Sequence, residues 1–264
     1  MSDVSSNPPV PDIAAAANPH QPAKALLMIV AVVVSYLFSS IAGAALIYVG
    51  YLAVHGQTMA ATWSADSVLA QFIYTAVVYA LLLATIGLGF RHWWHLHRRD
   101  IGLIRPKLSD PIYALLALPA YYIVYFIAIT IVSALAPSFN AQQQQQLGFN
   151  QAHGGGQLLL VFLSLVVIPP LVEEIVVRGY LYSGLKRSLP KIVAILLASA
   201  LFAVGHLEFG NGGPLVWVAA VFTFVLALFL TALREITGRI WASVFLHALV
   251  NGVSFYFLFV VGTH

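Results

Sequence analysis

The sequence contains no cysteine and few charged residues. Of its 264 residues, none is Cys and only 8% are Asp, Glu, Lys or Arg, against roughly a quarter in soluble domains. The absence of cysteine excludes disulfides, thiolate metal ligands and a cysteine nucleophile. Because 61% of the residues are hydrophobic, a water-soluble fold of this length could not bury its apolar surface. The composition therefore predicts a protein that folds in a lipid bilayer.

Hydrophobic runs of the length needed to span a membrane, roughly 20 residues, recur along the chain. They are residues 25–54, 67–90, 111–136, 157–182, 191–207, 215–233 and 240–261. These runs predict an all-α, polytopic transmembrane bundle of about seven spans in one domain, residues 23–264. We find no internal repeat. Residues 1–22, rich in Pro, Ala and Ser, are expected to form a disordered cytoplasmic tail.

The basic residues predict how the chain is oriented in the membrane. All twelve Lys and Arg residues precede the first run or lie around the second, fourth and sixth links between runs, whereas 55–66, 137–156 and 208–214 contain none. The positive-inside rule therefore predicts a cytoplasmic N-terminus and a C-terminus, His264, on the outer side. We expect a multi-pass protein of a bacterial plasma membrane. Its net charge of +3 indicates contact with the bilayer surface and not with nucleic acid.

Two acidic residues, Glu173 and Glu174, lie well inside the fourth run. Ionisable groups at membrane depth are costly, so they are usually functional or paired. On a helix Glu174 and Arg178 lie about 40° apart and can form an ion pair. Glu173 faces another direction and is expected to stay unpaired, which suits a general base. The alternative is a purely structural ion pair. Pro169-Pro170 should kink the helix here and leave backbone carbonyls free.

Two histidines and an asparagine occupy a similar predicted depth on other spans. His206 ends the fifth run, while His247 and Asn251 lie four residues apart in the seventh. Counting about 1.5 Å per residue from the cytoplasmic ends places them and Glu173 roughly 10–22 Å into the membrane. We therefore expect a buried active site between spans four, five and seven. A single intramembrane histidine that only bonds a neighbouring helix is the alternative.

These side chains suit the hydrolysis of an acyl bond by activated water. Glu173 would take a proton from water that His206 holds, and His247 with Asn251 would donate hydrogen bonds to the oxyanion. Other chemistries for cutting peptides in membranes lack their residues here. No pair of Asp lies within the spans, and neither H-E-x-x-H nor G-x-S-x-G occurs.

Three short motifs resemble those of one protein family. Glu173 to Arg178 resembles E-E-x-x-x-R, Phe202 to His206 resembles F-x-x-x-H, and His247 to Asn251 resembles H-x-x-x-N. In this order they are typical of the CAAX-protease and bacteriocin-processing (CPBP or Abi) intramembrane endopeptidases. The resemblance covers residues 157–256. Arg99-Asp100-Ile101-Gly102-Leu103 also resembles a family element. The family is often described with eight spans, whereas seven runs are present here.

The resemblance implies a catalytic set of Glu173, His206, His247 and Asn251, supported by Glu174 and Arg178. It also implies a membrane protein or peptide as substrate. Eukaryotic members remove a C-terminal tripeptide after prenylation of a cysteine, and bacterial members act in bacteriocin maturation, self-immunity or secretion. No cofactor is favoured. If a divalent metal such as zinc takes part, its ligands would be Glu173, His206 and His247.

Two other functions remain open from the sequence. A non-catalytic immunity or scaffold protein could use the polar residues only for helix packing. A proton-coupled transporter could use an intramembrane Glu/His chain as a relay. Neither requires an Asn one turn after a His together with an unpaired glutamate, and the transporter should show inverted repeats. We therefore predict an intramembrane endopeptidase.

Overall fold

The computed structural model describes residues 21–55, 67–143, 149, 152–207 and 215–262. Their regular elements are helical. In chain order they are α1 (Pro22–His55), α3 (Val68–Trp93), α4 (Ser109–Leu135), α5 (Gly155–Phe162), η1 (Leu163–Val167), α6 (Ile168–Glu173), η2 (Glu174–Leu181), α7 (Tyr182–Ser188), α8 (Lys191–Val204), α9 (Trp217–Thr237), α10 (Trp241–Phe255) and η3 (Tyr256–Val261). Residues 1–20 of the predicted tail lie outside the described residues. Helix α1 begins at Pro22, the last residue of that predicted tail.

The all-α membrane fold is confirmed. Six helical segments are long and apolar enough to cross a membrane: Pro22–Val54, Val68–Gly89, Ser109–Leu135, Gly155–Ser188, Trp217–Thr237 and Trp241–Val261. The fifth predicted span, residues 191–207, corresponds to α8, which has only 14 residues and a length of about 21 Å. A hydrocarbon core is about 30 Å thick. α8 is therefore shorter than the hydrocarbon core is thick, and it ends at Val204, two residues before His206.

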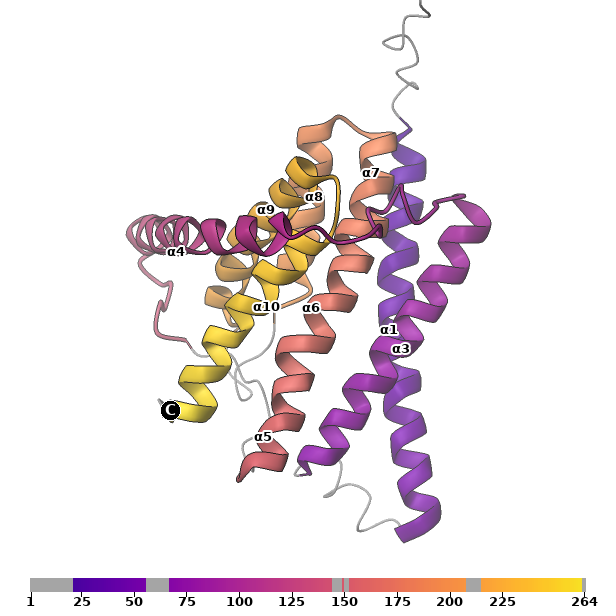
Figure 1. Cartoon of the computed structure of the whole chain (residues 1–264), viewed down its shortest axis with the longest axis vertical. Coiled ribbons are helices and arrows are strands. Elements are labelled where there is room, and N and C mark those ends of the chain that lie inside the picture. Colours follow the sequence, from indigo (N-terminus) through magenta and orange to yellow (C-terminus); the bar gives the residue numbers. More distant parts are fainter. Residues whose placement is uncertain (1–20, 56–66, 144–148, 150–151, 208–214, 263–264) are drawn as a thin grey trace, which may run out of the picture.

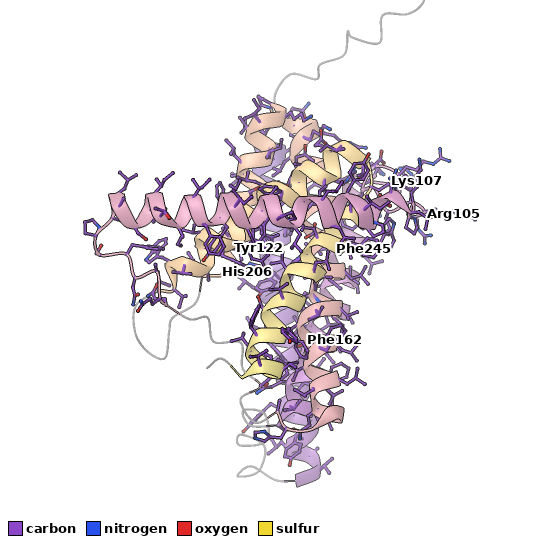
Figure 2. All side chains as sticks on the ribbon, turned by 60° about the vertical axis from the view of Figure 1, so that its left-hand side comes forward. Arg105, Lys107, Tyr122, Phe162, His206 and Phe245 are labelled. Carbon is purple, nitrogen blue, oxygen red and sulfur yellow. The ribbon has the colours of Figure 1, made fainter. Side chains whose placement is uncertain are left out.

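Helix α4 lies across the molecule. In both views it crosses the direction followed by α1 and by the α5–α7 segment (Figures 1 and 2). Its first turn is anchored because Arg239 donates to Asp110 from Nη2 at 2.7 Å, and farther along Tyr121 packs edge-on against Phe222 and Phe229 of α9. The third predicted span is therefore long and apolar enough to cross a membrane, but it does not run parallel to its neighbours.

The segment α5–η1–α6–η2–α7 is one long helical rod with two π-helical stretches, η1 and η2. Pro169 and Pro170 come one residue after η1, as the second and third residues of α6. The carbonyl of Leu165 would accept from residue 169 in an α-helix and from residue 170 in a π-helix, and proline has no N–H to donate. The two prolines thus leave this carbonyl without a donor from its own helix, as the sequence predicted for this stretch.

The rod is held by apolar packing and by ion pairs at one end. Val176, Leu181 and Leu185 belong to a buried cluster with Ile86 of α3 and Ala198 of α8, among others. The links that carry the basic residues come together at the end of the rod. Lys186 and Lys191 form ion pairs with Glu235 at 2.6 and 2.7 Å, and Arg187 forms one with Asp100 at 2.8 Å. These contacts fix the rod against α1, α3, α8 and α9, and so fix the side chains that it carries.

Candidate active site

A fully buried ion pair lies at the start of η2. Arg178 Nη1 donates to Glu174 Oε1 at 3.0 Å, and neither side chain is accessible to solvent. The guanidinium also donates from Nη2 to the carbonyl of Ala227 at 3.3 Å and lies 4.4 Å from the centre of the Phe202 ring. The ion pair expected from the i,i+4 spacing is therefore present, and it ties the rod to α8 and α9.

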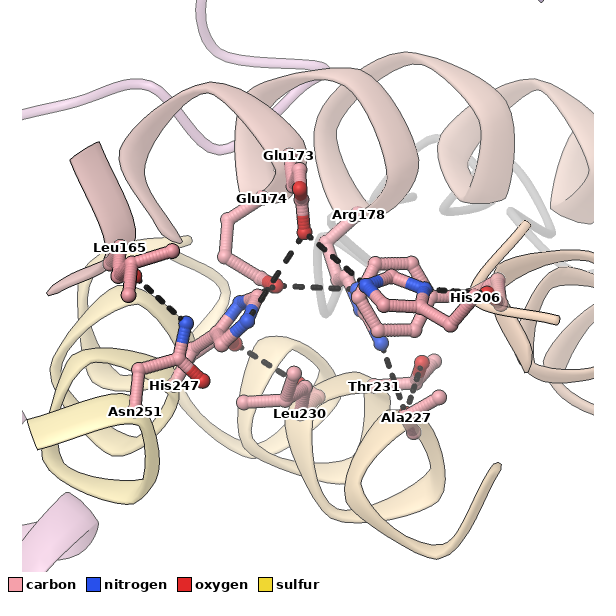
Figure 3. A network of polar contacts seen from close by, with 12 residues as sticks. Leu165, Glu173, Glu174, Arg178, His206, Ala227, Leu230, Thr231, His247 and Asn251 are labelled. Carbon is pink, nitrogen blue, oxygen red and sulfur yellow. Dashed lines mark hydrogen bonds and ion pairs between the residues drawn. The ribbon is translucent and has the colours of Figure 1, made fainter. Parts of the chain in front are cut away.

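Glu173, the last residue of α6, faces a different set of groups (Figure 3). Its Oε2 lies 3.9 Å from Nε2 of His206 and 3.9 Å from Nε2 of His247. This oxygen is buried and has no hydrogen-bond partner among the described residues. The other oxygen, Oε1, accepts a hydrogen bond from the hydroxyl of Tyr79. The sequence interpretation that Glu173 is unpaired was therefore wrong for Oε1, because a residue of another helix reaches it.

The backbone fixes the tautomer of His206. Its Nδ1 lies 2.8 Å from the carbonyl oxygen of Phe202. A carbonyl oxygen only accepts, so Nδ1 carries the proton. In the neutral imidazole Nε2 is then an acceptor, and this is the atom that faces Glu173. The His206 ring also contacts the Phe202 ring in a tilted arrangement, with centroids 4.4 Å apart, which further restricts the imidazole.

His247 of α10 lies between the two glutamates. Its Nδ1 is 3.0 Å from Glu174 Oε1, and its Nε2 is the atom that faces Glu173 Oε2. The imidazole is almost fully buried, with 4% of its side chain exposed, and meets Phe202 edge-on. The structure thus brings Glu173, His206 and His247 together from the three elements that the sequence singled out. Their catalytic role remains a prediction.

Asn251 makes a contact that the sequence did not specify. Its Nδ2 donates to the carbonyl of Leu165 at 2.8 Å, the carbonyl that Pro169 and Pro170 leave without a helical donor. Two turns earlier on α10, Ser243 donates to the carbonyl of Leu230 at 2.7 Å. The polar stripe of α10 therefore satisfies carbonyls of two neighbouring helices, and the second N–H of Asn251 remains for another acceptor.

A cavity of about 680 Å³ reaches the site from the side of α1 and α3. Glu173 and His206 form polar points in walls that are otherwise largely apolar, with contributions such as Val32, Leu82 and Val176. The side chains of Glu173 and His206 are 17% and 27% exposed. A substrate segment with apolar side chains could therefore enter from this side and reach the carboxylate.

The residues named for a metal do not fit a zinc ion in this arrangement. Two ligands of one tetrahedral zinc ion, each about 2.0 Å from it, lie roughly 3.3 Å apart, but both imidazoles are 3.9 Å from Glu173 Oε2. Over the described ranges no group of three or more His, Asp or Glu side chains could hold a metal ion.

The segment before α4 braces the rod from the basic end. The carbonyl of Asp100 accepts from Ser183 at 3.1 Å and from Arg234 at 2.9 Å. Hydrogen bonding from the backbone N–H of His97 lowers the pKa of the Asp100 carboxyl. Ile101 is buried against Gly179, where a Cβ would lie 3.4 Å from the Cβ of Ile101. The Arg99–Leu103 element therefore packs against Gly179, the residue after Arg178.

Comparison with known proteins agrees with the resemblance. Residues 155–253 match the family model described as Rce1-like, type II CAAX prenyl endopeptidase Rce1-like. No curated protein and no solved structure gives a significant match. The matched range holds Glu173, His206, His247 and Asn251, the four residues expected to form the catalytic set.

Proposed function

Since residues 155–253 carry the Rce1-like pattern of the CPBP family, we propose that this multi-pass membrane protein is an endopeptidase that hydrolyses a peptide bond of a membrane-associated substrate. The observation that carries this proposal is the position of Glu173 Oε2, buried and 3.9 Å from the Nε2 atoms of both His206 and His247. A buried carboxylate oxygen aimed at two imidazoles is costly unless it has a use or a further partner.

A water molecule is the partner that fits these three atoms. A water oxygen that bridges Glu173 Oε2 to an imidazole nitrogen 3.9 Å away can lie about 2.8 Å from both atoms, and both Nε2 atoms are at this distance from Oε2. One water proton points to Glu173 Oε2 and the other to His206 Nε2, which accepts because its Nδ1 proton is held by Phe202. The water oxygen is thereby made nucleophilic on the side that faces the cavity.

Proton counting assigns a different role to His247. The water has no third proton to give, so Nε2 of His247 must donate if it is to take part. The imidazole is then the imidazolium, which the contact from Nδ1 to Glu174 Oε1 at 3.0 Å stabilises. An Nε2–H donor beside Glu173 can bind the oxyanion that forms when water attacks the peptide carbonyl.

The reaction then follows in two steps. Water oxygen bonds to the carbonyl carbon while Glu173 takes a water proton, and the oxyanion receives hydrogen bonds from His247 and from the second N–H of Asn251. The C–N bond breaks when Glu173 passes this proton to the leaving amine. Glu174 and Arg178 do not exchange protons here; they hold His247 and the start of η2 in place.

The test uses purified protein in lipid nanodiscs and a quenched fluorescent peptide ending in a prenylated Cys-aliphatic-aliphatic-Xaa sequence, with the unprenylated peptide alongside. Wild type should cleave one of them, and Glu173→Gln should lose cleavage while melting normally. Addition of a chelator should leave the wild-type rate unchanged if water is activated without metal. Equal rates for wild type and Glu173→Gln would contradict the proposal.

One observation favours a second candidate, a non-catalytic immunity or scaffold protein. Asn251 already satisfies Leu165, which is what a packing role requires. In that case Glu173→Gln and Asn251→Ala would leave the protective or scaffolding function of the folded protein intact. The enzyme proposal predicts that Glu173→Gln removes it.

The orientation in the membrane follows from the charged end of the bundle. We propose that the end carrying Lys186, Arg187 and Lys191 faces the cytoplasm of a plasma membrane. Because the chain has no cysteine, single introduced cysteines report the topology without background. In intact cells an impermeant maleimide should label His153→Cys and spare Lys107→Cys. The opposite labelling would contradict this orientation.

A further inference from the structure

Tyr79 reaches the proposed base from a helix that the family match does not include. It lies in α3, 94 residues before Glu173, and its hydroxyl donates to Glu173 Oε1. The family match begins at residue 155, so neither the motifs nor the match names this residue. From the geometry we infer that Tyr79 is a positioning residue, which directs the second oxygen of Glu173 toward the two imidazoles. This inference rests on the proposed function of Glu173.

Because of this contact, the two oxygens of the Glu173 carboxylate have different partners. Oε1 is occupied by the phenol, and Oε2 faces Nε2 of His206 and of His247. The terminal torsion of a glutamate is broad, so an unrestrained carboxylate rotates freely about it. One fixed donor on Oε1 removes this freedom. Oε2, the proposed proton-accepting oxygen, then lies 3.9 Å from Nε2 of both imidazoles.

Helix α3 is itself held firmly enough for this task. Tyr79 packs against the buried cluster that contains Leu82, Val172 and Val176. Next to it, Val78 fills the space left by Gly43 of α1, where an added Cβ would lie 2.6 Å from the Cγ2 atom of Val78. α1 and α3 are therefore in close contact at this level, and the phenol ring enters the site from a rigid wall.

The phenol also lines the cavity beside Glu173. A hydroxyl that only stabilised the helix packing would not have to lie at the cavity. The Tyr79 hydroxyl contacts the Glu173 carboxylate at the place where a substrate would enter. If the hydrogen bond positions Glu173, its loss should change the ionisation and the turnover of the site and leave the helix packing intact. A structural role would change the stability instead.

The test compares Tyr79→Phe with Tyr74→Phe, which removes a hydroxyl from the same helix at a position that lines the separate pocket beside Ala44 and Ala70. The first measurement needs no substrate. Infrared difference spectra follow the carboxyl band that disappears in Glu173→Gln while pH is varied. Loss of a donor to the carboxylate should move its protonation midpoint to higher pH in Tyr79→Phe and leave it unchanged in Tyr74→Phe.

The second measurement is cleavage of whichever peptide the wild type accepts. Tyr79→Phe should lower kcat roughly tenfold to hundredfold with KM little changed, because a small misplacement of a catalytic group has effects of this size. An unchanged infrared midpoint would overturn the role of Tyr79 even if the enzyme is active. A shifted midpoint in a protein that cleaves neither peptide would uphold the contact and count against the proposed function alone.

Discussion

Nδ1 of His247 lies 3.0 Å from Oε1 of Glu174, and this same oxygen accepts the hydrogen bond from Arg178 Nη1 at 3.0 Å. A single carboxylate oxygen therefore joins the imidazole of α10 to the buried guanidinium of η2. The i,i+4 spacing indicated only the contact with Arg178. The contact with His247 spans 73 residues and follows from the way in which α10 packs against the rod.

Glu174→Gln should therefore harm the fold more than Glu173→Gln does. Arg178 would be left in the interior without its counter-charge, and removing one partner of a buried pair costs about 3–5 kcal/mol. Glu173→Gln keeps that pair and should melt close to wild type while losing cleavage. Thermal melts in detergent compare the two variants under one condition. Equal melting and equal loss of cleavage would mean that the two glutamates do not have separate roles.

The two prolines show which part of the site can be predicted from the sequence. Pro169 and Pro170 predict a free carbonyl near the site, because neither can donate to the residue a turn before it. In the structure this carbonyl belongs to Leu165, and Asn251 donates a hydrogen bond to it. This contact depends on how α10 packs beside η1. The motifs identify the residues of the candidate site, but they do not predict which atoms of these residues come into contact.

Tyr79 and α4 mark what the sequence could not predict. Tyrosines are common in these apolar runs, and nothing near residue 79 distinguishes it from Tyr74 on the same helix. Similarly, α4 has the length and hydrophobicity of a span, but its first turn is held by the pair between Asp110 and Arg239 and the helix lies across the bundle (Figures 1 and 2). Both relations join residues far apart in the chain, which a single sequence does not connect.

Gly102→Ala should weaken the contact between the segment before α4 and Arg234 of α9. Gly102 has φ +71°, and a Cβ there would lie 2.7 Å from Cζ of Arg234, a mostly buried side chain. The left-handed backbone alone costs about 1–2 kcal/mol for alanine. Moving Arg234 would also break its hydrogen bond to the Asp100 carbonyl, roughly a further 1.5–3 kcal/mol for a charged donor.

Gly238→Ala is the matched control for this change. Gly238 has φ +67° but nothing within 4 Å of an added Cβ, so the backbone cost alone should appear. Unfolding by denaturant in mixed micelles measures both variants. If Gly102→Ala loses no more stability than Gly238→Ala, then Arg234 adjusts freely and the segment does not act as a brace.

Asn251→Ala distinguishes catalysis from packing, since both roles assign this side chain a hydrogen bond. If its second N–H stabilises the oxyanion, turnover should fall roughly a hundredfold to a thousandfold with little change in substrate binding. If the bond to Leu165 is its only role, the variant should lose about 1 kcal/mol or less and turn over normally per folded molecule. Ser254→Ala is the control on the same helix, because that hydroxyl donates to its own backbone, at Val250. We expect Ser254→Ala to keep wild-type turnover and Asn251→Ala to lose it; turnover of Asn251→Ala within a few-fold of the control, corrected for folded protein, would assign Asn251 to packing.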